Sequence, residues 1–189
     1  NHSAGRHALI DSSKAPVDWS ILRELGDQWI QRDEEELVMG HWAYGQARHL
    51  LIAEERVGGG EQAPSDVKVA CCDGVPMYYF WADRSTDTVR LAFFTPDGER
   101  FIWGDERETQ LSALAGATPL PETIRNAMLH IGSAVGAPFD CLRIDFYVED
   151  GAIWFGELAP YTAGGLYAIN DMNDERFGAM WTLPDLSAL

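Results

Sequence analysis

The sequence predicts an α+β fold built from helices and antiparallel strands. Apolar residues recur at helical spacing in two separate stretches, and shorter apolar stretches between turn residues are typical of strands. Turn-forming groups such as Asp73-Gly74 and Glu149-Asp150-Gly151 separate neighbouring strand patterns, as expected of hairpins. The resulting order is a helix, several antiparallel strands, a helix and a hairpin, which differs from the regular βαβ alternation of a parallel α/β fold.

Two helices are expected. The first should run from about residue 18 to about residue 32, since its apolar side chains recur at helical spacing: Ile21, Leu22, Leu25, Trp29 and Ile30. The second opens at Pro121-Glu122 and ends at Gly136. Its predicted buried stripe consists of Ile124, Met128, Ile131 and Val135.

The strands are expected in four places. Residues 49–57, HLLIAEERV, are apolar and then charged, as in a strand leaving a core. Two strands flank Asp73-Gly74, and two more, TVRLAFF and RFIW, are joined through Pro96-Asp97-Gly98. The last hairpin is CLRIDFYV, a turn and AIWFGEL. The polar stretch from Asn170 to Glu175 is assigned to neither a helix nor a strand.

The charge of the chain limits its partners. The 189 residues carry a formal net charge of −16, so a general nucleic-acid or anionic-lipid partner is not expected, because phosphate binding needs a basic footprint. A phosphate-bearing ligand would have to be bound locally, by a few cations, backbone amides and a metal. The alternative is that the charge serves solubility alone.

No apolar run is long enough to cross a bilayer, and the start shows no signal-peptide pattern. We therefore expect no membrane insertion. The three cysteines, two of them adjacent in an apolar segment, fit buried thiols in a reducing cytoplasm better than a disulfide framework, so we expect a cytoplasmic protein. The histidines show no zinc-like spacing, so no structural zinc site is expected.

The last hairpin carries the candidate chemistry. A three-residue turn, Glu149-Asp150-Gly151, would set Val148 opposite Ala152 and Glu157 opposite Arg143, whereas a two-residue turn would place Glu157 on the wrong face. With the longer turn, Arg143, Asp145 and Glu157 share one face. The other face would hold the apolar residues Leu142, Ile144, Phe146, Val148, Trp154 and Leu158.

Two interpretations of this polar face stay open. A cross-strand salt bridge on an exposed face is common and contributes little stability. The other interpretation is a hard-cation site, because Mg²⁺ prefers one or two carboxylates together with phosphate oxygens. In that case the guanidinium would contact the transferring phosphate.

Longer segments resemble a known family. The string RIDFYVEDGAIWFGELAPYTAGG is similar to the metal-binding end of ATP-grasp enzymes, and most of all to the TupA-like branch, named for teichuronopeptide biosynthesis. Upstream, HWAYGQARHLLIAEERV and PSDVKVACCDG resemble further segments of that branch, and NHSAG resembles the start of its glycine-rich phosphate loop. The similarity runs along nearly the whole chain in the same order.

The resemblance implies an ATP-grasp fold, with two α+β lobes around a nucleotide cleft. Residues 1–50 would contain the glycine-rich loop and lid, with Ser3 and Gly5 in the loop. Residues 51–189 would form the carboxy-terminal lobe, with the adenine strand and the metal-binding hairpin. The family's region before the loop is not in this sequence, so we expect an incomplete active site.

The resemblance also implies the nucleotide contacts. Glu54 or Glu55 and the backbone through Val57 would contact adenine, and Asp66 would lie at or near the ribose. The alternative for the two glutamates is that they are surface charges at a strand end. Lys68 would reach the phosphates, although its alternation with apolar neighbours fits open solvent equally well.

At the metal end, the resemblance implies that Asp145 and Glu157 ligate Mg²⁺ and that Arg143 contacts the transferring phosphate. One departure matters here. Many ATP-grasp enzymes have Glu-x-Asn at the second metal position, whereas this chain has Ala159, which cannot coordinate a metal.

The implied activity is ATP-dependent ligation of a carboxylate to an amine or thiol through an acyl phosphate. The partners would be small-molecule substrates or a polymer precursor, as in cell-surface polysaccharide or peptide biosynthesis. Two alternatives remain: a catalytically incomplete ATP-grasp relic that serves as a nucleotide-binding or scaffold module, and a glycosidase with paired carboxylates.

Overall fold

The computed structural model describes residues 8, 10, 11, 13, 16–30, 46, 48–57, 65–83, 90–104, 112–113, 116–162, 169–183 and 185. The chain divides into two compact units, Asn1–Glu55 and Arg56–Leu189. The assignment of the first region to a lid and of the second to a carboxy-terminal lobe stays a prediction.

The first unit contains the predicted amino-terminal helix, α1 (Trp19–Trp29). Its start is fixed by Asp18, whose side chain accepts hydrogen bonds from the backbone amides of Ser20 and Ile21 and so satisfies two otherwise unpaired donors. The predicted end near Arg32 lies outside the described residues. Gly26 is buried, and a Cβ there would lie 2.6 Å from Leu51 Cδ1, so a glycine lets the two segments approach.

The strand predicted at residues 49–57 is wrong for the part that the structure describes. Residues 48–57 form neither a strand nor a helix. Leu50, Leu51 and Ile52 are exposed, so the apolar run that suggested a strand does not enter a core here. A run of apolar residues becomes a strand only where another strand pairs with it, and the sequence alone cannot supply that partner.

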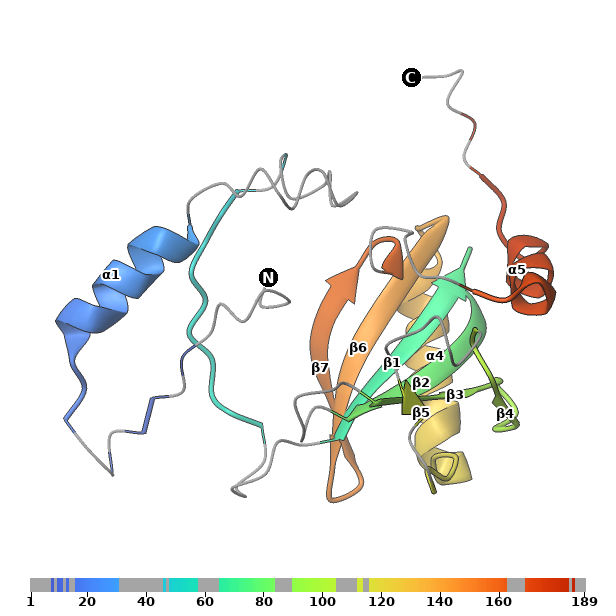
Figure 1. Cartoon of the computed structure of the whole chain (residues 1–189), viewed down its shortest axis with the longest axis horizontal. Coiled ribbons are helices and arrows are strands. Elements are labelled where there is room, and N and C mark those ends of the chain that lie inside the picture. Colours follow the sequence, from blue (N-terminus) through green and yellow to red (C-terminus); the bar gives the residue numbers. More distant parts are fainter. Residues whose placement is uncertain are drawn as a thin grey trace. The chain divides into compact units, whose positions relative to one another are not determined.

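The second unit is built on a seven-stranded sheet, seen face-on in Figure 1. Its strands are β1 (Ser65–Cys72), β2 (Val75–Asp83), β3 (Arg90–Phe94), β4 (Arg100–Phe101), β5 (Ser112–Ala113), β6 (Cys141–Glu149) and β7 (Ala152–Ala159). The order is β4-β3-β2-β1-β6-β7, all antiparallel, and β5 pairs with β3 in parallel. Together with three described helices, this confirms the predicted α+β class.

The first two hairpins form, although the strand expected at RFIW is shorter than predicted, because β4 ends at Phe101. Asp73 and Gly74 both have positive φ, at 48° and 74°, as a two-residue turn of type I′ requires. Between β3 and β4, Gly98 has φ of 92° and its amide donates to Thr95 O at 2.9 Å, which closes the turn through Pro96 and Asp97.

Helix α4 (Glu122–Gly136) packs on one face of the sheet, behind it in Figure 1. The predicted bounds are confirmed, and so is the burial of Met128, with Ile124 and Val135 partly buried beside it. The prediction for Ile131 is wrong, since its side chain is exposed. Gly132 lies against the sheet instead: a Cβ there would lie 3.1 Å from Val69 Cγ1, so a glycine lets the helix backbone approach β1.

The opposite face carries helix α5 (Asp171–Gly178) over part of its area. Phe177 of this helix packs among aromatic side chains of the sheet and of the segment after β4, namely Tyr78, Phe101 and Trp103. Buried Asn173 donates to Ile102 O at 2.6 Å and fixes the helix there. The sequence does not predict this helix, because most of its residues are polar and Phe177 is its one buried aromatic.

Candidate functional site: a cluster of charges across three strands

The hairpin of β6 and β7 has a two-residue turn, not the predicted three-residue turn. Asp150 and Gly151 have φ of 49° and 76°, and Val148 lies opposite Ile153. The prediction that Val148 faces Ala152 is therefore wrong. If this pairing continued without a bulge, Glu157 would lie opposite Ile144, on the apolar face.

A β-bulge at Gly156 restores the phase of the second strand. The register passes from Phe146 opposite Phe155 to Asp145 opposite Glu157, which leaves Gly156 as the extra residue. A Cβ at Gly156 would lie 3.0 Å from the backbone oxygen of Asp145, so the close approach favours glycine. Asp145 and Glu157 consequently share one face, as predicted, although by a different route.

The bulge also corrects two details. Glu157 lies opposite Asp145, whereas the predicted partner Arg143 lies opposite Ala159. Trp154 lies opposite Tyr147, so it belongs to the polar face and is exposed, and its predicted place among the apolar residues is wrong. Leu158, opposite Ile144, keeps its predicted face.

Five charged side chains meet on the face opposite α4; we call them the charge cluster: Asp66, Lys68, Arg143, Asp145 and Glu157. Asp145 lies at the centre. Its Oδ1 accepts from Arg143 Nε at 2.6 Å, and its Oδ2 accepts from Arg143 Nη2 at 2.9 Å and from Lys68 Nζ at 2.5 Å. Arg143 Nη2 also donates to Glu157 Oε1 at 3.1 Å.

The sheet register explains why these residues meet. Lys68 on β1 lies directly opposite Asp145 on β6, and Asp145 lies directly opposite Glu157 on β7. Residues two apart on a strand share a face, which adds Asp66 beside Lys68 and Arg143 beside Asp145. Lys68 Nζ donates to Asp66 Oδ1 at 2.7 Å. Lys68 points away from its apolar neighbours, as predicted. Its side chain lies in the charge cluster and not in open solvent.

Burial and charge make the cluster more than a surface pair. Lys68 and Asp145 are only 6% and 4% exposed, whereas the Glu157 side chain is 36% exposed, so the cluster opens to solvent on the β7 side. Burial acts to lower the pKa of Arg143, but the hydrogen bonds to Asp145 and the charges of Asp145, Glu157 and Asp66 outweigh it and raise that pKa. Arg143 therefore stays charged.

The oxygen donors of the charge cluster fit Mg²⁺ only in part. Among the described residues, no group of three or more His, Cys, Asp or Glu side chains is placed to hold a metal ion. Two directly opposed carboxylates, Asp145 and Glu157, nevertheless match the one or two that Mg²⁺ takes when phosphate oxygens and water complete its octahedron. Because Arg143 and Lys68 now occupy both oxygens of Asp145, a metal there would have to displace one of these contacts.

The roles of the other predicted site residues stay predictions. Glu54 and Glu55 are exposed and belong to the first unit, and Val57 lies in a bend of the second. Ser3 and Gly5 lie outside the described residues. Ala159 ends β7 opposite Arg143 and offers no side-chain ligand.

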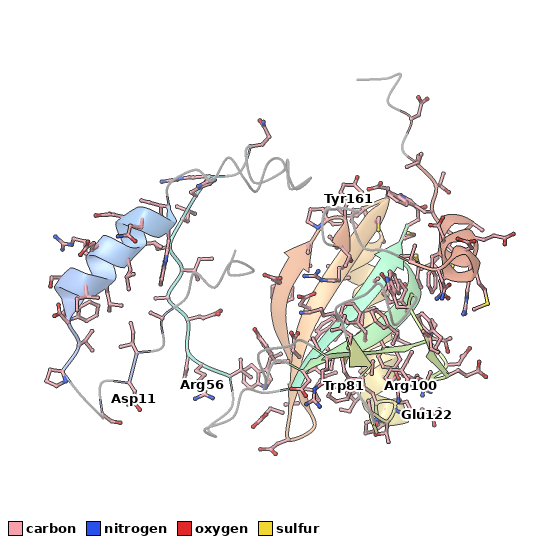
Figure 2. The ribbon with its side chains drawn as sticks, viewed as in Figure 1. Asp11, Arg56, Trp81, Arg100, Glu122 and Tyr161 are labelled. Atoms are coloured by element: carbon pink, nitrogen blue, oxygen red, sulfur yellow. The ribbon has the colours of Figure 1, made fainter. Side chains whose placement is uncertain are left out.

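A second polar group at the far end of the sheet was missed by the sequence analysis. Tyr161 follows β7 with φ of 53° and its hydroxyl donates to Asp140 at 3.2 Å, while Trp181 Nε1 donates to the same carboxylate at 3.1 Å. Figure 2 shows Tyr161 at the end of the sheet opposite to Trp81. Burial and the charge of Asp140 raise the pKa of Tyr161. No spacing in the sequence links three residues so far apart.

Comparison with known proteins gives the family. The profile of the TupA-like ATP-grasp family matches residues 23–182. The chain belongs to the TupA-like ATP-grasp family. The three strands that carry the charge cluster all lie within the matched part of this ATP-grasp chain, whereas Ser3 and Gly5 precede it.

Solved structures similar to this TupA-like chain include two of D-alanine–D-alanine ligase from Bacillus anthracis. The one complexed with ATP is 12% identical, with a TM-score of 0.36 over 78% of this chain and 44% of that chain. The other is 12% identical, with a TM-score of 0.35 over 79% and 47%. This chain thus spans less than half the length of either, and no curated protein matches it.

None of the helices that the structure describes is both long enough and apolar enough to span a bilayer.

Proposed function

We propose that this chain forms part of an ATP-dependent ligase, in which the charge cluster holds Mg²⁺ and the phosphates of ATP. The observation that carries the proposal is the position of Asp145 and Glu157, directly opposed on neighbouring strands and joined by one guanidinium. Membership of the ATP-grasp family supports the choice of nucleotide.

Each member of the cluster would have a separate task. Asp145 and Glu157 would ligate Mg²⁺, which when bound neutralises phosphate charge. Arg143 presents several N–H donors in a fixed plane, which suits the oxygens of the transferring phosphate, and Lys68 would add a second positive charge. These groups are already held in place by the sheet, so they would lose little freedom when the nucleotide binds.

The proposed reaction joins a carboxylate to an amine or a thiol. A carboxylate oxygen attacks the γ-phosphorus of ATP, the bond from that phosphorus to the β,γ-bridging oxygen breaks, and ADP leaves. The amine nitrogen then attacks the carbonyl carbon of the acyl phosphate, inorganic phosphate leaves, and the nitrogen loses a proton. Such chemistry depends on positioning and charge neutralisation, and no side-chain nucleophile is required.

The proposed substrates are small carboxylates and amines, or precursors of a cell-surface polysaccharide or peptide. We place the reaction in the cytoplasm, where ATP is available. Residues Glu54, Glu55 and Val57 remain proposed adenine contacts, with Ser3 and Gly5 in the proposed phosphate loop.

The experiment is an assay of ADP release by the protein with Mg²⁺, ATP and mixtures of candidate carboxylates and amines. Release should require both substrates, and Asp145→Asn should lower it by roughly 10²–10³, as expected for a preorganised electrostatic group. The matched control is Glu149→Gln on the same strand, outside the cluster, which should retain normal turnover. Equal turnover in wild type and Asp145→Asn would contradict the proposed role.

A second candidate is a nucleotide-binding module without turnover, and Ala159 favours it, since Asn at this place would supply a further ligand. Mg·ATP binding without ADP release under any substrate mixture would support this candidate over the ligase. Paired carboxylates in a glycosidase are disfavoured, because one of them must hold a proton to donate. Here both accept hydrogen bonds from Arg143.

A further inference from the structure

We infer that Asp66 is a positioning residue, which holds the Lys68 ammonium when a divalent ion takes Asp145. The inference rests on the proposed function of the charge cluster. It gives Asp66 a role different from the ribose contact that the family resemblance implies.

The contacts of Lys68 carry the argument. Its Nζ lies between two carboxylates, 2.7 Å from Asp66 Oδ1 and 2.5 Å from Asp145 Oδ2, and the residue is only 6% exposed. A buried ammonium is strongly disfavoured unless an opposite charge or several hydrogen bonds compensate it. Lys68 therefore needs a carboxylate in whichever state the cluster adopts.

A metal at Asp145 changes this balance. Both oxygens of Asp145 now accept hydrogen bonds, Oδ1 from Arg143 and Oδ2 from Arg143 and Lys68, so an ion bound through Oδ2 would compete with Lys68 for that oxygen. When Lys68 loses that contact, Asp66 remains as its partner on the same strand. Without Asp66, Lys68 would depend on Asp145 more strongly and would compete with the ion for it.

The register argues against Asp66 as a metal ligand. Asp66 lies on β1 opposite Tyr147, two residues along the strand from Lys68. Strand β6 lies between Asp66 and Glu157, which is on β7. Asp66 thus acts on the site through Lys68. The same contact would keep the ammonium directed along the face where phosphate oxygens would lie.

A double-mutant cycle on Mn²⁺ binding tests the inference without any measurement of turnover. Free Mn²⁺ is measured by electron paramagnetic resonance in the wild-type chain, Asp66→Asn, Lys68→Met and the double variant. Asp66→Asn should weaken Mn²⁺ binding by roughly fivefold, within the range found for residues in contact. In the Lys68→Met background, the same change should alter the affinity by less than about twofold.

Three controls accompany the cycle. Asp145→Asn defines the signal that belongs to the cluster, since a chain of net charge −16 also attracts Mn²⁺ elsewhere. Asp97→Asn, in the exposed turn between β3 and β4, removes one charge outside the cluster and should leave the affinity unchanged. Asp66→Glu keeps the negative charge and should bind Mn²⁺ with most of the wild-type affinity. Thermal unfolding verifies that each variant is folded.

The outcomes separate the inference from the proposed function. An equal loss from Asp66→Asn in both backgrounds would mean a general charge effect and would overturn the positioning role. An unchanged affinity in Asp66→Asn would overturn it as well, while Mg·ATP binding by the wild type would keep the proposed function. Absence of Mn²⁺ binding that depends on Asp145 would overturn both.

Discussion

At the scale of single residues, Gly156 decides whether the candidate site exists. The two-residue turn puts β7 out of phase with β6, and the bulge at Gly156 brings Glu157 back to the face of Asp145. The glycine is needed because a side chain there would meet the Asp145 backbone oxygen at 3.0 Å and the Tyr147 ring at 3.4 Å. One residue without a side chain thus sets the direction of a carboxylate beside it.

The first prediction concerns this glycine. Gly156→Ala should lower the free energy of unfolding by about 1–3 kcal/mol, the usual cost of overpacking, and should weaken Mg·ATP binding as Glu157 shifts. Gly178→Ala is the matched control, because a Cβ there would meet nothing within 4 Å. Chemical denaturation measures the first effect and calorimetry the second. Unchanged stability and affinity in Gly156→Ala would show that the bulge does not constrain the site.

The second prediction concerns Asp145, whose burial excludes the weak surface salt bridge that the sequence left open. Asp145→Asn leaves Lys68 and Arg143 without their shared charge, and breaking a buried ion pair in this way typically costs about 3–5 kcal/mol. We expect a loss in that range by chemical denaturation. A loss of about 0–1 kcal/mol would instead fit a solvated pair.

At the scale of elements, turns and α4 follow from local signals, whereas pairing does not. Asp73-Gly74 and Pro121-Glu122 mark their elements through backbone geometry that these residues prefer. The bulge at Gly156, by contrast, depends on a partner strand, and residues 49–57 pair with no strand in the part of the chain that the structure describes. Helix α5 could not be predicted from apolar spacing, because its one buried aromatic, Phe177, gives no periodic pattern.

The third prediction concerns the packing of α4 on β1. Burial raises the pKa of Cys71 from 9.0 to about 12, aided by the charge of Cys141, and burial also raises the pKa of Tyr79. The folded state therefore holds these protons more tightly than the unfolded chain. This stabilisation is complete below pH 9 and is lost as the pH rises toward 12.

We therefore expect the free energy of unfolding to fall between pH 9 and 12, by up to about 1.4 kcal/mol per pH unit for each group. Cys71→Ala should make this fall shallower. Val67→Ala, on the same strand and the same face, should lower stability equally at every pH. Identical slopes for wild type and Cys71→Ala in denaturation at several pH values would contradict the assignment.

At the scale of the whole molecule, the chain has a net charge of −16 and yet holds two cations, buried Lys68 and half-buried Arg143, on one face of its sheet. The sequence could indicate Arg143, Asp145 and Glu157 as a group, because alternation and family resemblance both pointed there. It could not indicate that Lys68 and Asp66 complete the cluster through one contact, because that depends on the register of β1 with β6. An acidic protein with this arrangement should bind an anionic nucleotide only when a divalent ion accompanies it.

The most direct measurement is a calorimetric titration of the chain with ATP, once with Mg²⁺ and once with a chelator, on wild type, Glu157→Gln and the control Glu149→Gln. Mg²⁺ should strengthen ATP binding at least about tenfold in wild type and in the control, because a charge-assisted metal contact contributes more than 1.4 kcal/mol. Glu157→Gln should lose most of that gain. ATP affinity that ignores Mg²⁺, or the same gain in Glu157→Gln as in wild type, would contradict the claim that Asp145 and Glu157 hold the ion.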